Sequence, residues 1–566
     1  MDSFVIFPPL VETSIDGPYL SCPIIASYLR KHGLDVDYID LNIEFISYFY
    51  CDMIKSPNSV NELQYLLYKN ALKNDIKEKT KFSRFLPYLV SLLPIEKQRL
   101  SAITEVEYLP QKSKHILKKI FSAKRIRSLC PDINVWMFSV LCVDQLPYLA
   151  FIIKLIKTEY NNAIILTGGA FFNLLDPKMI ENFKNKFSIT EIFQSDSEFK
   201  LLKFLSKLKN ISINVMAHNT FFINQVSNLN IKFNMSQYTY SKNIIPIYIS
   251  IGCNWAKCTF CDYTRVSSST ACYKIRPIDE IVNQIKNYIL DGYTKFYLIS
   301  DSPTYGFLTT FAKTIIQENI KIEFSCFLRI SPAHDKSFFT LLKKAGVDCI
   351  TFGVESFINR ILILMKKGFT SHIAIKNIID ANTAGCKCII NQIYDFPTIS
   401  VQEIHENLQI LWENIGYIYK LNWFSFCLSP FSGIMQELDV YNITPIAGPV
   451  LSRQIGLEIP FENDKTINWE IIKMKYIKLE KSILRRFFLR RIIENNDISF
   501  LKKHKYNNKL YITNLENGKT ISIRKDISPT NILIYMKKFK TINNYLMSNH
   551  DSTNYLSHLC EKLVSV

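Results

Sequence analysis

Three cysteines, Cys253, Cys258 and Cys261, lie within nine consecutive positions of this chain. The chain has 14 cysteines among 566 residues, and independent placement would give such a triplet in about one chain in a hundred. Three thiolates on one loop can ligate three irons of a cubane cluster, for which four thiolates are the usual complement. The triplet therefore predicts a [4Fe–4S] centre with one iron open to a ligand from outside the protein.

Two other interpretations of the triplet compete with a cluster. Zinc prefers four ligands, and Cys272, 11 residues after Cys261, could complete such a set. Alternatively, the three thiols could be structural residues of a core. The composition of the loop stands against both, because Gly252, Asn254 and Lys257 are poor core residues. We favour the iron–sulfur centre.

The segment around the triplet, residues 245–440, has a regular alternation of apolar strands and amphipathic helices. Strands are predicted at 246–251, 295–299, 322–327, 349–354, 387–394 and 422–427. Helices are predicted near 277–291, 308–318, 335–345, 372–384 and 401–414. Six such units predict an open, partial (β/α)6 version of the TIM-type barrel. The cysteine loop follows the first strand, at the end where barrel enzymes carry their chemistry.

Residues 1–208 predict a second α/β domain, a doubly wound parallel sheet of Rossmann-like type with a helical insertion at about 50–130. One of its strands ends in the pair Gly168-Gly169, which permits a close backbone approach to a ligand or forms a tight turn. The polar, Asn-rich stretch 209–244 is predicted to be a linker. Ligands of such sheets bind at the carboxyl ends of the strands.

Residues 441–566 predict a small α+β appendage without an evident catalytic set. A basic amphipathic helix spans 473–491, and two alternating runs flank Asn517-Gly518 in the stretch 510–523. An Asn-Gly pair between such runs indicates a hairpin with a type I′ turn. With helices near 529–538 and 540–547, the segment is similar to a winged-helix-like recognition module.

The net charge of +18 raises the question of a nucleic-acid partner. Only the 473–491 helix concentrates this charge, so we favour solvated faces over a polyanion site. The N-terminus lacks the features of a signal peptide, and Asp144 and Pro147 interrupt the one apolar stretch long enough to resemble a membrane span. Scattered cysteines outside the triplet indicate a reducing, cytoplasmic compartment and no membrane partner.

Several side chains fall at the functional end of the predicted barrel. Arg329 ends the third strand, and Glu355 and Ser356 end the fourth. From the residues alone, a solvated strand end or a surface ion pair explains them equally well. Cys386 and Cys388 share one face of a strand, where core packing is favoured over metal ligation.

The loop Gly252-Cys-Asn-Trp-Ala-Lys-Cys-Thr-Phe-Cys261 resembles the cluster motif of radical S-adenosylmethionine enzymes. The resemblance continues through 273–277, 342–346, 352–356 and 364–369. Further pieces resemble the cobalamin-binding domain that precedes the barrel in one branch of that family, which includes peptide-maturation C-methyltransferases. These pieces are 7–10, 28–33, 39–42 and 166–170.

The resemblance implies three cofactors: a [4Fe–4S] cluster, S-adenosylmethionine and cobalamin. It implies that the three cysteines ligate the cluster and that Phe260, between two of them, shields it. The contacts implied for S-adenosylmethionine are Phe260, Ser300, Arg329, Glu355 and Ser356. The contacts implied for cobalamin are Ser139, Gly168, Gly169 and Ala170.

The chain also departs from the family pattern. Four residues separate the first two cysteines, where three are commoner, and this longer form occurs in the cobalamin branch. The usual Gly-Gly-Glu is replaced by Ile299-Ser-Asp-Ser302, and Asp395-Phe-Pro-Thr398 has lost both glycines of Gly-Phe-Pro-Gly. The motif that supplies a histidine to the cobalt is absent.

The resemblance therefore implies an enzyme that generates a 5′-deoxyadenosyl radical, a cobalamin-dependent C-methyltransferase of peptide or natural-product maturation. Its partners would be a peptide or small-molecule substrate and a reductant such as a flavodoxin or ferredoxin, and the appendage would suit a leader peptide. Two alternatives remain. The charge is compatible with an RNA-modifying enzyme, and the lost glycines at 395 and 398 with a catalytically eroded scaffold of the same fold.

Overall fold

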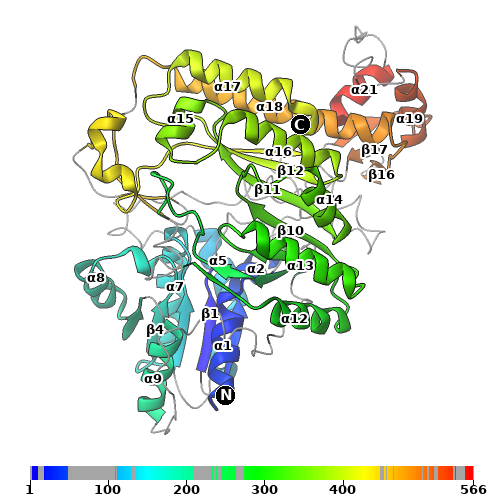
Figure 1. Cartoon of the computed structure of the whole chain (residues 1–566). Helices are drawn as coiled ribbons and strands as arrows, with labels where there is room; N and C mark the ends of the chain where they lie inside the picture. Colours follow the sequence, from blue (N-terminus) through cyan, green and yellow to red (C-terminus); the bar gives the residue numbers. More distant parts are fainter. Residues whose placement is uncertain are drawn as a thin grey trace.

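The computed structural model contains two parallel α/β sheets and a small C-terminal module (Figure 1). Cys272, Asn517-Gly518, most of the predicted insertion and linker, and most of the predicted 540–547 helix lie outside the described residues. The residues that the structure describes are 3–9, 18–48, 109, 111–129, 135–194, 197–209, 231, 233, 238, 244–262, 273–446, 451–453, 456–462, 464–499, 501–506, 509–514, 520–539, 542 and 555–564.

The N-terminal sheet is parallel, with the strand order β2-β1-β3-β4-β5. Its strands are β1 (Ser3–Phe7), β2 (Val36–Asp40), β3 (Val135–Ser139), β4 (Ile164–Gly168) and β5 (Glu191–Phe193). Its helices are α1 (Ser21–Lys31), α2 (Leu41–Tyr48), α5 (Gln111–Ile120), α6 (Ala123–Leu129), α7 (Leu146–Glu159), α8 (Pro177–Phe187) and α9 (Ser197–Lys209). Every residue of β1 and β3 is buried, as expected of a sheet that is covered on both faces. The predicted doubly wound domain is confirmed.

The second sheet is the predicted open barrel, in the order β13-β12-β11-β10-β9-β6 with all neighbours parallel. Its strands are β6 (Ile244–Tyr248), β9 (Lys295–Ile299), β10 (Glu323–Leu328), β11 (Val347–Glu355), β12 (Lys387–Ile393) and β13 (Lys420–Phe424). Its helices are α12 (Ile278–Leu290), α13 (Tyr305–Gln317), α14 (Lys336–Lys344), α15 (Asn359–Leu364), α16 (Ser371–Thr383) and α17 (Val401–Glu413). All six strands and all five helices predicted for this segment are present, and α15 is an additional helix.

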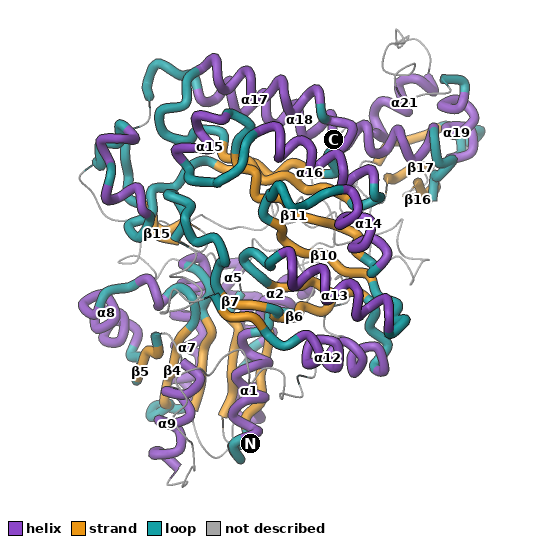
Figure 2. The backbone as a smooth tube through the Cα atoms, in the orientation of Figure 1, coloured by secondary structure: helices purple, strands orange, loops and turns teal. Residues whose placement is uncertain are grey.

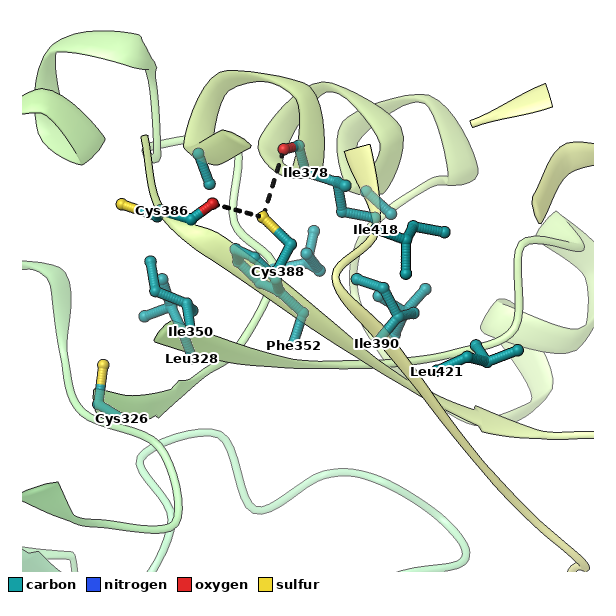
Figure 3. Close-up of a cluster of buried hydrophobic side chains, with 14 of the residues drawn as sticks. Cys326, Leu328, Ile350, Phe352, Ile378, Cys386, Cys388, Ile390, Ile418 and Leu421 are labelled. Carbon is teal, nitrogen blue, oxygen red and sulfur yellow. Dashed lines mark hydrogen bonds between the residues drawn. The ribbon is translucent and has the colours of Figure 1, made fainter. Parts of the chain in front are cut away.

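Alternate residues of the barrel strands face the helices and form the main hydrophobic core. Figure 3 shows part of this layer, with side chains from β10, β11 and β12 beside Ile378 of α16. Cys386 and Cys388 are 2% and 0% exposed, and the Cys388 Sγ lies 3.6 Å from the Ile378 carbonyl oxygen. The prediction that these two thiols pack in the core is confirmed.

The helix α18 (Trp469–Ile493) joins the barrel to the C-terminal module. Its first half contributes Tyr476 and Leu479 to the barrel core, and its second half contributes Phe488 and Ile492 to the core of the module. Figure 1 shows α18 running alongside α17 and on into the module. The predicted basic helix therefore connects the core of the barrel to the core of the module, and it also presents a charged surface.

The described residues of the C-terminal module form a three-stranded antiparallel sheet and two helices. Its elements are β16 (Leu501–Tyr506), β17 (Lys509–Asn514), β18 (Thr520–Ile523), α19 (Pro529–Lys537) and α21 (Tyr555–Val564). Strands β17 and β18 pair in the register of the predicted hairpin, from Leu510–Ile523 to Thr513–Thr520. Within the described residues, no helix is both long and apolar enough to cross a membrane.

Figure 1 shows the N-terminus at the end of β1 that is remote from the barrel. Since all strands of this sheet are parallel, their carboxyl ends point toward the barrel. Tyr248 and Ile299, at the ends of β6 and β9, pack against the core of the N-terminal domain. Phe233 packs against the cores of both domains. The carboxyl-end edge of the N-terminal sheet thus adjoins the strand ends of the barrel sheet.

Candidate functional site

The cysteine loop lies at the carboxyl end of the barrel. It follows the short strand β7 (Ser250–Ile251), which pairs with β8 (Lys274–Ile275), and Cys253 forms a parallel bridge with Ser302 after β9. Cys253 and Cys258 are partly buried, and Cys261 is exposed. The loop is therefore anchored on the barrel rim with its last thiol open to solvent.

Hydrogen bonds to two other segments hold the loop in place. The Thr259 amide donates to the Met365 carbonyl at 3.1 Å, and the Ile434 amide donates to the Thr259 carbonyl at 3.0 Å. The Ser429 hydroxyl donates to the Asp262 carboxylate at 2.6 Å. Residues that follow α15 and β13 thus clamp a loop that follows the first barrel strand.

A buried ion pair lies beside the loop. The Lys367 Nζ is 3.6 Å from the Glu355 Oε1, and the two side chains are 7% and 13% exposed. The Lys367 Nζ also lies 5.8 Å from the centre of the Phe260 ring. Glu355 has φ 69° at a register shift between β11 and β12, a conformation that costs a non-glycine residue about 1–3 kcal/mol. Such strain is typical of functional sites.

Two cations act on the central thiol of the triplet. Burial raises the pKa of Cys258, and the positive charge of Lys367 opposes this shift. Arg329 also opposes the rise in the Cys258 pKa, whereas Cys253 and Glu355 add to that rise. Overall the pKa of Cys258 stays above its ordinary value, because burial outweighs the two cations beside the thiol.

The three cysteines supply three of the four thiolates that are usual for a cubane cluster. Among the residues that the structure describes, no group of three or more His, Cys, Asp or Glu side chains converges as the ligands of one ion. The thiolates of a cubane bind different irons and need not converge on one point. The clamped loop thus presents three thiols that could each ligate one iron of such a cluster.

The other residues predicted to contact S-adenosylmethionine divide into two groups. Phe260 is part of the cysteine loop, and Arg329 and Glu355 lie close to Cys258 in that loop. Ser300 and Ser356 are buried with partners of their own: the Ser300 hydroxyl bonds the Ser250 hydroxyl, and the Ser356 Oγ accepts from the Ile358 amide at 3.1 Å. Their hydroxyl groups serve the fold in this structure.

The residues predicted to contact cobalamin lie at the carboxyl ends of β3 and β4. Ser139 is 5% exposed and pairs with Gly168. Gly169 has φ 113°, and a Cβ there would lie 2.4 Å from the Val140 carbonyl oxygen. The close packing of the neighbouring strand end thus explains why Gly169 must be glycine. Ala170 is half-buried beside it.

A glutamine that the sequence analysis did not single out organises the same edge. Gln145 is 0% exposed, accepts from the Leu141 amide at 2.6 Å, and donates to the Pro8 carbonyl at 2.7 Å. It thereby joins the loops after β1 and β3, where the strand order reverses and ligands of such sheets bind. In the sequence, the only indication of this role is that Gln145 is a polar residue within the apolar stretch 135–156.

The segment that lost both glycines keeps the turn by other means. Thr398 has φ 69°, and its carbonyl accepts from the Arg360 Nη2 at 2.7 Å. Arg360 also makes a two-pronged ion pair with Glu403. Asp395 accepts hydrogen bonds from the Phe426 amide and the Ser425 hydroxyl, which ties the end of β12 to the end of β13. The changed residues therefore build a defined local structure.

The inner face of the barrel sheet is neutral at the middle of its strands. The Asn422 amide donates to the Asn391 side chain at 3.0 Å. Tyr297 and Phe327 form an edge-to-face pair with ring centres 6.3 Å apart, and Phe327 is 37% exposed. This face combines aromatic surface with amide groups and lies below the rim that carries the cysteine loop.

Comparison with known proteins identifies the domain that carries this site. Residues 247–411 match the model of the radical SAM superfamily. No protein of curated function matches the chain in sequence. The match covers the cysteine loop and the barrel as far as α17, so this part of the chain is a radical SAM domain.

Solved structures resemble the chain over both sheets. One is the radical S-adenosylmethionine methyltransferase TsrM from Kitasatospora setae with cobalamin and a [4Fe–4S] cluster bound, at TM-score 0.54 and 12% identity over 85% of this chain and 91% of that one. Another is the cobalamin-dependent S-adenosylmethionine radical enzyme OxsB with aqua-cobalamin and S-adenosylmethionine bound, at TM-score 0.56 and 14% identity over 99% and 74%. At such identities, the likeness establishes the fold.

Proposed function

We propose that this protein is a cobalamin-dependent radical S-adenosylmethionine methyltransferase acting on a small natural product or peptide. The observation that carries the proposal is the clamped triplet of Cys253, Cys258 and Cys261, with the buried cation Lys367 beside it. The radical SAM domain and the likeness to two cobalamin enzymes support the same assignment.

In this proposal the cysteines hold a [4Fe–4S] cluster, which when bound supplies the electron that cleaves S-adenosylmethionine to methionine and a 5′-deoxyadenosyl radical. Lys367 and Arg329 offset the negative charge of the thiolates and suit a ligand carboxylate. Glu355, held in its strained conformation, suits a ligand amine. Phe260, whose ring centre lies 5.8 Å from the Lys367 Nζ, would shield one side of the cluster.

Cobalamin would occupy the edge where the loops after β1 and β3 meet. The order reversal between these strands, the Gln145 bridge and the orientation of this edge toward the barrel support that placement. Methylated cobalamin would supply the methyl group. A reductant such as a flavodoxin or ferredoxin would deliver the electrons.

The inner face of the barrel favours a neutral substrate with planar or amide groups. Tyr297 and Phe327 offer aromatic surface, and Asn391 with Asn422 offers amide donors and acceptors. Such groups recognise the parts of natural products and peptides that carry no charge. The ion pairs that we find on α18, such as Arg490 with Glu494, support solvated faces rather than a bare polyanion site.

The ultraviolet–visible spectrum of protein purified anaerobically with cobalamin supplied tests this function. We expect broad iron–sulfur absorption together with corrinoid bands, and only the corrinoid bands should persist in Cys258→Ala. Cys386→Ala, which alters a core thiol, should keep both. A wild-type spectrum without corrinoid bands would contradict the cobalamin part of the proposal, and one without iron–sulfur absorption would contradict all of it.

A further inference from the structure

The longer spacing between the first two cysteines accommodates an indole that is held on several sides. The Trp255 Nε1 donates to the Lys366 carbonyl at 2.9 Å. The guanidinium carbon of Arg329 lies 3.7 Å from the centre of the Trp255 ring, and the Lys257 Nζ lies 5.0 Å from it. An indole stacked on a guanidinium in this way is a strong cation–π arrangement.

Gly368 makes the space for the indole. It has φ +70°, and a Cβ there would lie 2.4 Å from two atoms of the Trp255 ring and 2.9 Å from the Arg329 Nη2. Any other residue would push the indole and the guanidinium apart. Trp255, Arg329 and Gly368 therefore form a tightly fitted group, which we term the Trp255 cluster.

The Trp255 cluster is connected to the charges beside the thiols. Arg329 donates from its Nη2 to the Lys367 carbonyl, and Lys367 pairs with Glu355. Arg329 lies close enough to Cys258 and Cys253 for their charges to raise its pKa, although burial lowers it overall. A displaced indole would therefore move Arg329, and with it the segment that presents Lys367.

We propose that Trp255 is a positioning residue that fixes the cations Arg329 and Lys367 against the cysteine loop and thereby sets the reduction potential of the cluster. The inference rests on the proposed function, because it requires a cluster at the triplet. Reduction adds negative charge, and a nearby fixed cation stabilises that charge in a site of low dielectric. Trp255 thus raises the reduction potential.

The test compares Trp255→Ala and Trp255→Phe with Trp412→Ala, a control at a half-exposed tryptophan on α17. Each protein is reconstituted anaerobically, and its iron content, midpoint potential and electron paramagnetic resonance spectrum are measured. We expect a more negative potential and a changed spectrum in Trp255→Ala, a smaller change in Trp255→Phe, and wild-type values in the control. Wild-type potential and spectrum in Trp255→Ala would overturn the inference.

Gly368→Ala perturbs the Trp255 cluster through its added Cβ, which meets the indole and the guanidinium. This variant tests the inference if Trp255→Ala binds no iron. It is compared with Gly306→Ala, where a Cβ meets nothing within 4 Å. A negative potential shift in Gly368→Ala but not in Gly306→Ala supports the inference, and equal potentials overturn it. A wild-type protein that holds a cluster yet releases no 5′-deoxyadenosine contradicts the proposed function while the potential still tests Trp255.

Discussion

The ammonium group of Lys367 faces the carboxylate of Glu355 at 3.6 Å, almost shielded from water, at the rim of the barrel beside the cysteine loop. Removal of one partner from a buried pair leaves an uncompensated charge, which costs about 3–5 kcal/mol. This pair is the feature of the site that neither spacing nor composition reveals, because a lysine in the run 364–369 looks like a surface residue.

Lys367→Met should lower the free energy of unfolding by about 3 kcal/mol, because Glu355 is left buried and unpaired. Lys376→Met, which breaks the exposed pair of Lys376 with Asp380, should cost less than about 1 kcal/mol. Denaturant unfolding of both variants measures the difference. Equal losses would show that the pair at the rim is solvated.

Gly169→Ala should destabilise the N-terminal domain by about 3 kcal/mol, because the added Cβ overlaps the Val140 carbonyl in a backbone conformation that favours glycine. Gly306→Ala, with open space around its Cβ, should leave stability within about 1 kcal/mol of wild type. Thermal unfolding monitored by circular dichroism checks both. A stable Gly169→Ala protein that lost cobalamin would instead assign this glycine to the ligand.

Asn407→Ala should lower the free energy of unfolding by about 3 kcal/mol, since it leaves buried groups on one loop, one strand and one helix without their partner. Asn407 accepts from the Phe357 amide at 2.7 Å and donates to Gln392 at 2.8 Å and to the Tyr476 hydroxyl at 2.9 Å. Gln409→Ala, on the exposed face of the same helix, serves as the control. Similar stabilities would exclude this network as the attachment of α18 to the barrel.

The buried carboxyl group of Asp40 should make the free energy of unfolding depend on pH. Burial raises the pKa of this carboxyl group to about 6, although the Tyr238 hydroxyl donates to it at 2.7 Å. The folded state therefore binds the proton more tightly than the unfolded state, whose carboxyl pKa is about 3.9. The Asp40 contribution thus becomes less favourable as the pH rises from about 4 to 6, by roughly 2–3 kcal/mol.

Asp40→Asn removes this dependence, because its amide keeps an acceptor for Tyr238 and has no proton to lose. We expect the stability of Asp40→Asn relative to wild type to increase by roughly 2–3 kcal/mol between pH 4 and pH 7. Urea unfolding at several pH values measures this difference. A constant difference across the range would mean that Asp40 is solvated.

The strands and helices of the barrel follow from the sequence because each has a clear apolar period. The predicted helix at 401–414 and the observed α17 (Val401–Glu413) differ by one residue, and the predicted strand at 295–299 coincides with β9. The carboxyl-end position of the cysteine loop follows from strand order alone. Each of these properties can be read from the apolar pattern of a single segment or from the order of the segments along the chain.

The contacts of the site were not predictable in the same way. Trp255 meets Gly368 across more than 100 positions of sequence, and Gln145 meets Pro8 across a similar distance. The stacking of Arg329 on Trp255 and its hydrogen bond to the Ile330 carbonyl likewise join residues that no local pattern connects. Packing between distant segments decides such roles, and no single segment carries the information.

The most direct test of the central claim is the release of 5′-deoxyadenosine by anaerobically reconstituted protein given S-adenosylmethionine and dithionite. We predict that wild type and Cys386→Ala release 5′-deoxyadenosine and methionine in equal amounts, and that Cys253→Ala releases neither. Release by Cys253→Ala at the wild-type level, or no release by a wild-type protein that holds a reduced cluster, would contradict the account.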